Sequence, residues 1–314
     1  MPSSDAPRIS FRTAVVGVDG REGGRDAIAL AASLLEPGGH LVLAAVVRPH
    51  GGERLGALIA DADRQVAAQM LEAERERLGV PATTVVAVRS SISEGLHSVV
   101  VEHHADLLVV GSAHRGPVGR VLLGDDARRA LRGAPCAVAV APHGVPDRPV
   151  WRTIAVGDDG SAESDLALAA ARGLAARTGA RIRDCSVIGP ASLGYRELSR
   201  MDSSEALAER TFQERKRLAT HVDVDGEVLQ GDSGEALAEL SSDVDLIVIG
   251  SRGQGPWGRL VTGSTAEYLA RHAACPVLIL PRAVSSSTAP ASGEPFPDPH
   301  EPAVAVRESQ SRSH

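Results

Sequence analysis

The sequence contains two copies of one pattern, about 140 residues apart. The run that begins Thr13-Ala-Val-Val-Gly-Val-Asp-Gly recurs 140 positions later as Thr153-Ile-Ala-Val-Gly-Asp-Asp-Gly. A second run, Asp106-Leu-Leu-Val-Val-Gly-Ser, recurs 139 positions later as Asp245-Leu-Ile-Val-Ile-Gly-Ser. Two long matches in the same order at nearly one offset indicate a duplicated domain, because solenoid repeats are far shorter. We therefore expect two domains of the same fold.

Each copy alternates short β-branched runs with longer helical stretches. In the first copy we expect strands at Thr13–Val18, His40–Val47, Thr83–Val88, Asp106–Val110 and Cys136–Val140, and helices at Gly24–Leu35, Arg54–Leu78, Glu94–His103 and Asp125–Arg132. In the second copy we expect strands at Thr153–Val156, Arg181–Val187, Asp223–Leu229, Asp245–Ile249 and Val277–Leu280. This alternation predicts an α/β fold with a parallel sheet, right-handed crossovers and helices on both faces.

Composition restricts the class of protein. Apolar residues form 43% of the 314 residues but aromatic residues only 2%, which favours helix-covered parallel sheets with aliphatic cores. The net charge of −7 argues against a general nucleic-acid binder. The three cysteines show no metal or disulfide spacing, and no apolar run approaches ~18 residues. We expect a cytoplasmic protein that contacts neither nucleic acid nor membrane.

Proline and glycine mark the borders of the two domains. The stretch from His143 to Val150 contains two prolines and one glycine, and it is too short to let the domains separate far. We expect domain one at residues 9–143 and domain two at residues 151–282. Residues 283–314 are rich in Ser and Pro and poor in apolar residues, which predicts a disordered tail.

A glycine-rich stretch between a strand and a helix is the main functional signal. In the second copy, Gly250-Ser-Arg-Gly253 is followed after nine residues by Gly263-Ser-Thr265. Glycine lets backbone N–H groups approach an anion, and the next helix adds unpaired N–H groups and the positive end of its dipole. The pattern predicts a phosphate site, although Ser264 can equally cap the helix and Arg252 can be solvated at the surface.

Together these motifs resemble the universal stress protein family, in a tandem form with two domains. The resemblance rests on a strand that ends in Gly-Val-Asp-Gly, a Gly-x2-Gly-x9-Gly-Ser/Thr loop and a last strand of Cys-Pro-Val-Leu type, and it covers about residues 9–282. It implies two tandem Rossmann-like domains, each with a five-stranded parallel sheet of order 3-2-1-4-5. It also implies binding of ATP, with or without Mg²⁺, or of another adenine nucleotide, and a role in stress or dormancy regulation.

Carried over by position, the resemblance assigns a nucleotide site to the second domain. Asp159 would contact the adenine base, Val187 would line the base pocket, and Ile249 would pass close to the ribose together with Gly250. The phosphates would be held by Gly253, Gly263, Ser264 and Thr265, with Arg252 beside the loop. The resemblance also implies that the two halves pair within the chain through their fifth strands, and that the chain can form a homodimer.

The two copies of the loop are not equivalent. His114 stands where the second copy has Gly253, and Asp125 stands where it has Ser264. A histidine adds a Cβ to a loop suited to none, and an aspartate adds a negative charge where the phosphates are expected. We therefore expect domain two to bind the nucleotide and domain one to bind weakly or not at all.

Two features leave other functions open. Asp158 replaces the apolar Val18 of the first copy, and a second carboxylate beside Asp159 is expected to repel phosphates or alter base recognition. The sequence also lacks a P-loop, a lysine in the glycine loop and a nucleophile elbow, so we do not expect an enzyme. The alternatives are a nucleotide-free interaction module, in which Asp125 and Asp158 mark a decayed site, and a weak ATP-hydrolysing or adenylyl-transferring enzyme.

Overall fold

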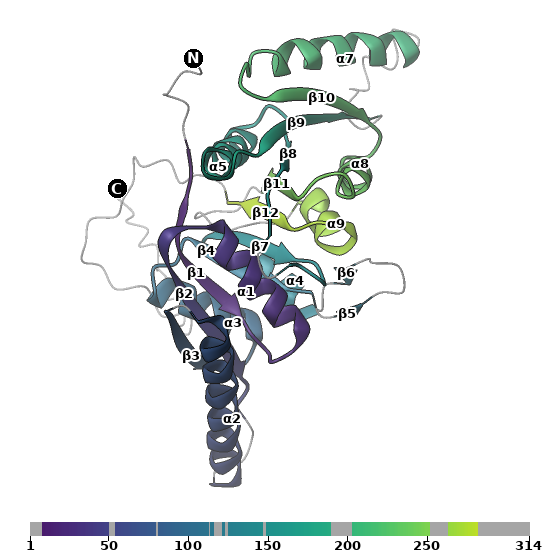
Figure 1. Cartoon of the computed structure of the whole chain (residues 1–314). Coiled ribbons are helices and arrows are strands. Elements are labelled where there is room, and N and C mark those ends of the chain that lie inside the picture. Colours follow the sequence, from purple (N-terminus) through teal and green to yellow (C-terminus); the bar gives the residue numbers. More distant parts are fainter. Residues whose placement is uncertain are drawn as a thin grey trace, which may run out of the picture. The chain divides into compact units, whose positions relative to one another are not determined.

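The computed structural model of the chain describes most of both repeats (Figure 1). The described ranges are 8–49, 54–79, 81–112, 114–115, 121–122, 125–146, 149–189, 203–251 and 263–281. Arg252 and Gly253, both expected at the phosphate loop, lie outside these ranges, as does the expected tail at 283–314.

The first half alternates strands and helices as the sequence predicts. Its elements are β1 (Phe11–Gly17), α1 (Glu22–Leu34), β2 (Leu35–Val47), α2 (Arg54–Leu78), β3 (Ala82–Val88), α3 (Ile92–Glu102), β4 (Leu107–Gly111), α4 (Asp125–Leu131) and β7 (Ala137–Ala141). A short hairpin, β5 (His114–Arg115) with β6 (Val121–Leu122), lies between β4 and α4. The sequence did not predict this hairpin, because two-residue strands carry no detectable periodicity.

The second half repeats the series. Its elements are β8 (Thr153–Gly157), α5 (Ala162–Thr178), β9 (Arg181–Ile188), α7 (Ser203–Leu218), β10 (Asp225–Gln230), α8 (Ser233–Leu240), β11 (Leu246–Gly250), α9 (Ser264–His272) and β12 (Val277–Leu280). The predicted boundaries mostly agree within two residues. The main exception is β2, which begins five residues before the predicted start because Leu35 pairs with Phe11 ahead of a register irregularity.

Each half has the predicted strand order. The order is β3-β2-β1-β4-β7 in the first half and β10-β9-β8-β11-β12 in the second, which is 3-2-1-4-5 in both. Within each half, all strand pairs of the main sheet are parallel. The predicted fold is confirmed. Between the halves, β12 runs antiparallel to β7, with Leu278 opposite Ala139.

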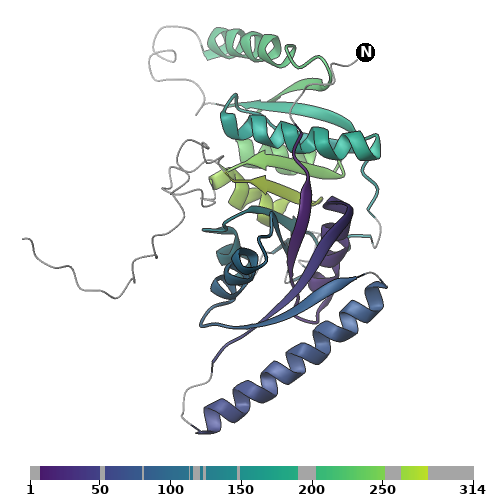
Figure 2. The same ribbon diagram turned by 90° about the vertical axis from the view of Figure 1, so that its left-hand side faces the viewer.

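Helices lie over both faces of the sheet (Figures 1 and 2), and each face has its own layer of buried aliphatic side chains. Alternate strand residues point to opposite faces, so Val16 belongs to the layer under α1, α2 and α5, whereas Val15 belongs to the layer under α3, α4, α8 and α9. Both side chains are fully buried. No helix in the described ranges combines the length and apolarity that a membrane crossing requires.

Candidate functional site

A cavity of about 160 Å³ lies at the carboxyl ends of β8, β9 and β11 in the second half. This is the edge at which open parallel sheets bind ligands. Its lining comprises Gly157, Asp158, Asp159, Ser161, Ser164, Cys185, Val187, Ser233, Leu237, Ile249, Gly250, Gly263, Ser264, Thr265 and Ala266. Of the nine residues that the sequence assigns to a nucleotide site, the seven that the structure describes all line this cavity.

The first turn of α9 forms one wall of the cavity. Gly263 occupies the N-cap position and has no side chain to bond the free N–H groups that follow. Ser264 and Thr265 begin the helix and line the same wall. These N–H groups and the positive end of the helix dipole favour an anionic ligand at this wall.

Gly250 is a glycine because of packing around it. A Cβ at this position would lie 2.6 Å from the backbone carbonyl carbon of Glu163 in α5, a distance that real Cβ atoms do not adopt. Gly111, its counterpart in the first half, meets the same obstacle, since a Cβ there would lie 1.8 Å from the carbonyl oxygen of Gly23. The tight approach of a helix start to a strand end explains both glycines without a ligand.

Asp159 is exposed at the mouth of the cavity and closes a turn. Its Oδ1 atom accepts hydrogen bonds from the backbone N–H of Ser161 at 3.1 Å and from the Ser161 hydroxyl at 2.5 Å. This is the behaviour of an aspartate in an Asx turn. The hydrogen bonds from Ser161 hold the Asp159 side chain in place beside the cavity.

Asp158 is buried, and its charge is balanced inside the protein. Its Oδ2 atom accepts a hydrogen bond from Arg217 of α7 at 2.7 Å, and its Oδ1 atom accepts from the N–H of Gly160 and the hydroxyl of Ser164, both at 2.8 Å. Burial alone would raise the pKa of Asp158, but these hydrogen bonds hold it below its ordinary value. The pairing with Arg217 weakens the repulsion of phosphate that the sequence led us to expect.

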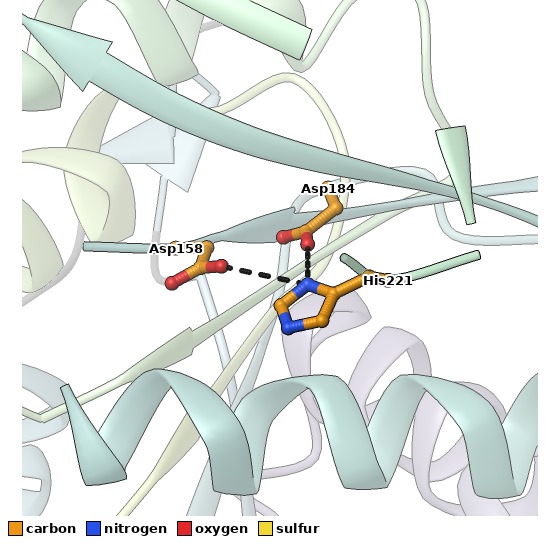
Figure 3. A group of neighbouring side chains, drawn as sticks. All are labelled: Asp158, Asp184 and His221. Atoms are coloured by element: carbon orange, nitrogen blue, oxygen red, sulfur yellow. Dashed lines mark hydrogen bonds and ion pairs between the residues drawn. The ribbon is translucent and has the colours of Figure 1, made fainter. Parts of the chain in front are cut away.

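A second buried carboxylate lies next to Asp158 (Figure 3). Asp184 of β9 is fully buried, and its Oδ2 atom lies 2.6 Å from Nδ1 of His221, just beyond α7. Burial raises the pKa of Asp184 to about 6, although the hydrogen bond to His221 works in the opposite direction. A contact this short places a proton between the two atoms, carried either by Nδ1 of the imidazole or by the carboxyl group.

Glu214 completes this network beneath α7. Its carboxylate accepts a hydrogen bond from Arg217 at 2.8 Å and from the Ser186 hydroxyl of β9 at 3.2 Å, while Arg210 lies 3.2 Å away on the exposed side. We call Asp158, Asp184, Ser186, Glu214, Arg217 and His221 the α7 network. It connects the cavity residue Asp158 to the whole inner face of α7.

Sequence reasoning identified only one member of the α7 network. Asp184 carries a detectable signal, because it stands among apolar residues in a predicted strand, where the first copy has Leu43. Glu214, Arg217 and His221 carry none, because charged residues are ordinary on an amphipathic helix. Their inward direction becomes visible only in the structure.

The corresponding cavity of the first half is larger and more apolar. It has a volume of about 670 Å³, and its lining includes Val18, Val46, Met70 and Leu96, together with Asp19 and Gly111. His114 lies in β5, paired with Leu122 of β6. The expected difference in nucleotide affinity between the two domains stays a prediction.

Comparison with known proteins agrees with the duplicated architecture. The pattern of the universal stress protein family matches residues 10–142 and again residues 151–281. A universal stress protein of Mycobacterium tuberculosis is 29% identical over 229 residues, which cover 70% of this chain and 77% of that protein. Another from the same organism is 32% identical over 136 residues, covering 42% of this chain and 49% of that protein. The crystal structure of a universal stress protein from Archaeoglobus fulgidus superposes with a TM-score of 0.60 at 18% identity, covering 87% of this chain and 99% of that one. The chain therefore belongs to the universal stress protein family and contains the family's domain twice.

Proposed function

We propose that the protein binds ATP or another adenine nucleotide, mainly in its second domain, and acts in stress or dormancy regulation rather than in catalysis. The convergence of seven expected contact residues on one cavity carries this proposal. The cavity contains a helix start without a side-chain cap, which suits phosphate, and apolar walls from Val187, Leu237 and Ile249, which suit a base.

The fit to a whole nucleotide requires some opening of the cavity. Sites for ligands of this size typically measure ~300–1,000 Å³, whereas this cavity measures about 160 Å³. We expect a Mg²⁺ ion that accompanies the nucleotide to be held mainly by the phosphates. Asp158 is paired with Arg217, and Asp159 accepts hydrogen bonds from Ser161.

We further propose that the two halves act as one body. Besides the pairing of β12 with β7, Arg177 of α5 donates hydrogen bonds to the carbonyl oxygens of Leu34 and Leu35 in the first half. In addition, the N–H of Ile9 donates to the carbonyl of Ala169 at 3.0 Å. The pairing of β12 with β7 covers the fifth-strand edges, which would otherwise be open to aggregation. A homodimer would then use another surface.

Titration of the purified, nucleotide-free chain with ATP tests the proposal. We expect one molecule of ATP per chain and at least a tenfold loss of affinity in Gly263→Val, because a β-branched side chain blocks access to the N–H groups of α9. Ser91→Val is the matched control, since Ser91 is the N-cap of α3 in the first half, where it bonds the N–H of Glu94. This variant should lose stability but keep its ATP affinity.

Three outcomes would contradict parts of the proposal. Two equal sites, or an unchanged affinity in Gly263→Val, would overturn the assignment to the second domain. An absence of binding for all adenine nucleotides would leave the nucleotide-free interaction module. Steady release of ADP or AMP by the wild type, abolished in Gly263→Val, would establish the enzyme instead.

A further inference from the structure

The buried cluster of Asp158, Asp184 and His221 has the composition of a metal site. One ligand atom from each residue lies within 4.8 Å of the other two. Nδ1 of His221 lies 2.6 Å from Oδ2 of Asp184 and 4.0 Å from Oδ2 of Asp158. Figure 3 shows the three side chains pointing toward one another from β9, from the end of β8 and from the segment after α7.

An unpartnered oxygen within the cluster points to a missing ligand. Oδ1 of Asp184 is buried and accepts no hydrogen bond from any residue in the described ranges, whereas every other polar atom of the two carboxylates has a partner. A buried acceptor without a partner costs ~1–3 kcal/mol, and more when it is charged. The unpartnered Asp184 oxygen lies on the side of the carboxylate that faces Asp158 (Figure 3).

The charge of the α7 network also favours an added cation. In the part of the chain that the structure describes, three carboxylates, Asp158, Asp184 and Glu214, meet a single inward guanidinium, that of Arg217. Arg210 reaches Glu214 only from the exposed side, with 47% of its own side chain accessible. Arg217 opposes a cation at Asp158, but Glu214 lies 2.8 Å from Arg217 and offsets its charge.

We propose that Asp158, Asp184 and His221 bind one divalent transition-metal ion, such as Zn²⁺, in place of the proton shared by Asp184 and His221. One imidazole and two carboxylates suit Zn²⁺, Co²⁺ or Mn²⁺, whereas Ca²⁺ and Mg²⁺ prefer oxygen ligands alone. Zn²⁺ bonds of ~2.0–2.2 Å place tetrahedral ligand atoms ~3.3 Å apart. The present separations of 2.6 and 4.0 Å reach that value when the imidazole moves from Asp184 toward Asp158 by under ~1 Å.

The surroundings provide a second shell and an entry path. The hydrogen bonds from Gly160 and Ser164 fix the Asp158 carboxylate, as outer partners of metal ligands commonly do. The side chain of His221 is 23% exposed, so an ion can reach Nδ1 and keep a water as its fourth ligand. The ion would then tie the C-terminal end of α7 to β8 and β9.

Cobalt titration of the metal-free, untagged full chain tests this site in the absence of nucleotide. We expect visible Co²⁺ absorption from the low-coordinate N/O site, saturating at one ion per chain and displaced by Zn²⁺. Asp184→Asn and His221→Ala should each weaken binding at least tenfold. His143→Ala is the matched control, because His143 lies 3.3 Å from Asp26 and 3.6 Å from Glu22 in the first half without forming such a cluster.

The wild type alone can decide the proposal if a variant fails to fold. Absence of a stoichiometric Co²⁺ or Zn²⁺ complex at millimolar metal would overturn it and leave the proton as the occupant. An unchanged affinity in folded Asp184→Asn and His221→Ala, or a loss in His143→Ala, would place the ion elsewhere. A rise in the melting temperature with Zn²⁺ that disappears in Asp158→Asn would add support, because a ligand of the native state stabilises it.

Discussion

The two halves have the same fold but differ in the residues that lie between the second helix and the first two strands. In the first half, Val16 of β1 pairs with Leu43 of β2. In the second half, Val156 of β8 pairs with Asp184 of β9 at the same register position. Further members of the α7 network likewise replace apolar residues: Val18 by Asp158, Ala45 by Ser186, Ala67 by Glu214 and Met70 by Arg217.

The interface between the second helix and the sheet can therefore be built either from apolar contacts or from ion pairs and hydrogen bonds. Leu71 of α2 and Leu218 of α7 are both fully buried, so each helix keeps an apolar anchor. Around that anchor, the first half gains ~1.5–3 kcal/mol for each large apolar side chain that it buries. A buried ionic network gains little net stability, because desolvation offsets the attraction between its charges. We infer that the α7 network exists for binding or coupling.

The largest expected effect follows from removing the cation of the network. Arg217→Met leaves Asp158 without a guanidinium partner and Glu214 with that of Arg210 alone. Breaking a buried pair in this way costs ~3–5 kcal/mol. We expect a loss at the lower end of this range, because the Arg217 side chain is 30% exposed. Urea unfolding in EDTA measures it. Arg210→Met should cost under ~1 kcal/mol, since the Arg210 side chain is 47% exposed and Arg217 still partners Glu214. Equal losses in the two variants would remove the distinction between the inward and the exposed arginine.

Replacing five of the six residues of the α7 network, all but His221, should restore stability. The second half would receive the set Asp158→Val, Asp184→Leu, Ser186→Ala, Glu214→Ala and Arg217→Met, which copies the first half. Apolar replacement of buried ion networks is neutral or stabilising by ~1–4 kcal/mol. We expect the fivefold variant to be at least as stable as the wild type in EDTA. A loss as large as that of Arg217→Met would show that the network stabilises the fold directly.

The fold could be predicted from the sequence because it depends on the periodicity of apolar residues and on the glycines and prolines that end strands and helices. Apolar periodicity located nearly every strand. Because the pattern is duplicated, the same fold could be predicted independently from each repeat. The sequence also selected the cavity residues Gly263, Ser264 and Thr265, since a helix start after a glycine has a local signature. It could not predict the α7 network, because which face of a charged helix turns inward depends on the residues of β8 and β9. Nor could it separate the packing role of Gly250 from a binding role.

The glycines at the ends of β4 and β11 test a feature that the two halves share. Gly111→Ala and Gly250→Ala should both destabilise the nucleotide-free protein by ~1–3 kcal/mol, because the new Cβ meets backbone atoms that cannot move aside. The first-half variant should lose more, since its Cβ would lie 1.8 Å from an oxygen rather than 2.6 Å from a carbon. If Gly250→Ala kept full stability but lost ATP binding, its glycine would be a ligand requirement and the shared packing explanation would be wrong.

The smallest expected effect concerns a contact between α5 and the segment after α7 whose arginine has no counterpart in the first half. Arg172 donates two hydrogen bonds of 2.7 Å to Asp223, and these bonds lower the pKa of Asp223. In the first repeat, the position of Arg172 is occupied by Ala32, which is exposed.

A carboxylate with a lowered pKa in the folded state stabilises the protein above its unfolded pKa of ~3.9, and this contribution disappears as the pH falls through the folded value. Arg172→Ala should therefore cost about 1 kcal/mol at pH 7, and its unfolding free energy should approach that of the wild type as the pH is lowered toward 3. Ala32→Arg, which adds the same charge to the first half, should change stability by under ~0.5 kcal/mol at either pH. A pH-independent loss in Arg172→Ala would assign its effect to packing of the arginine stem, and the polar character of the second half would then be confined to the α7 network.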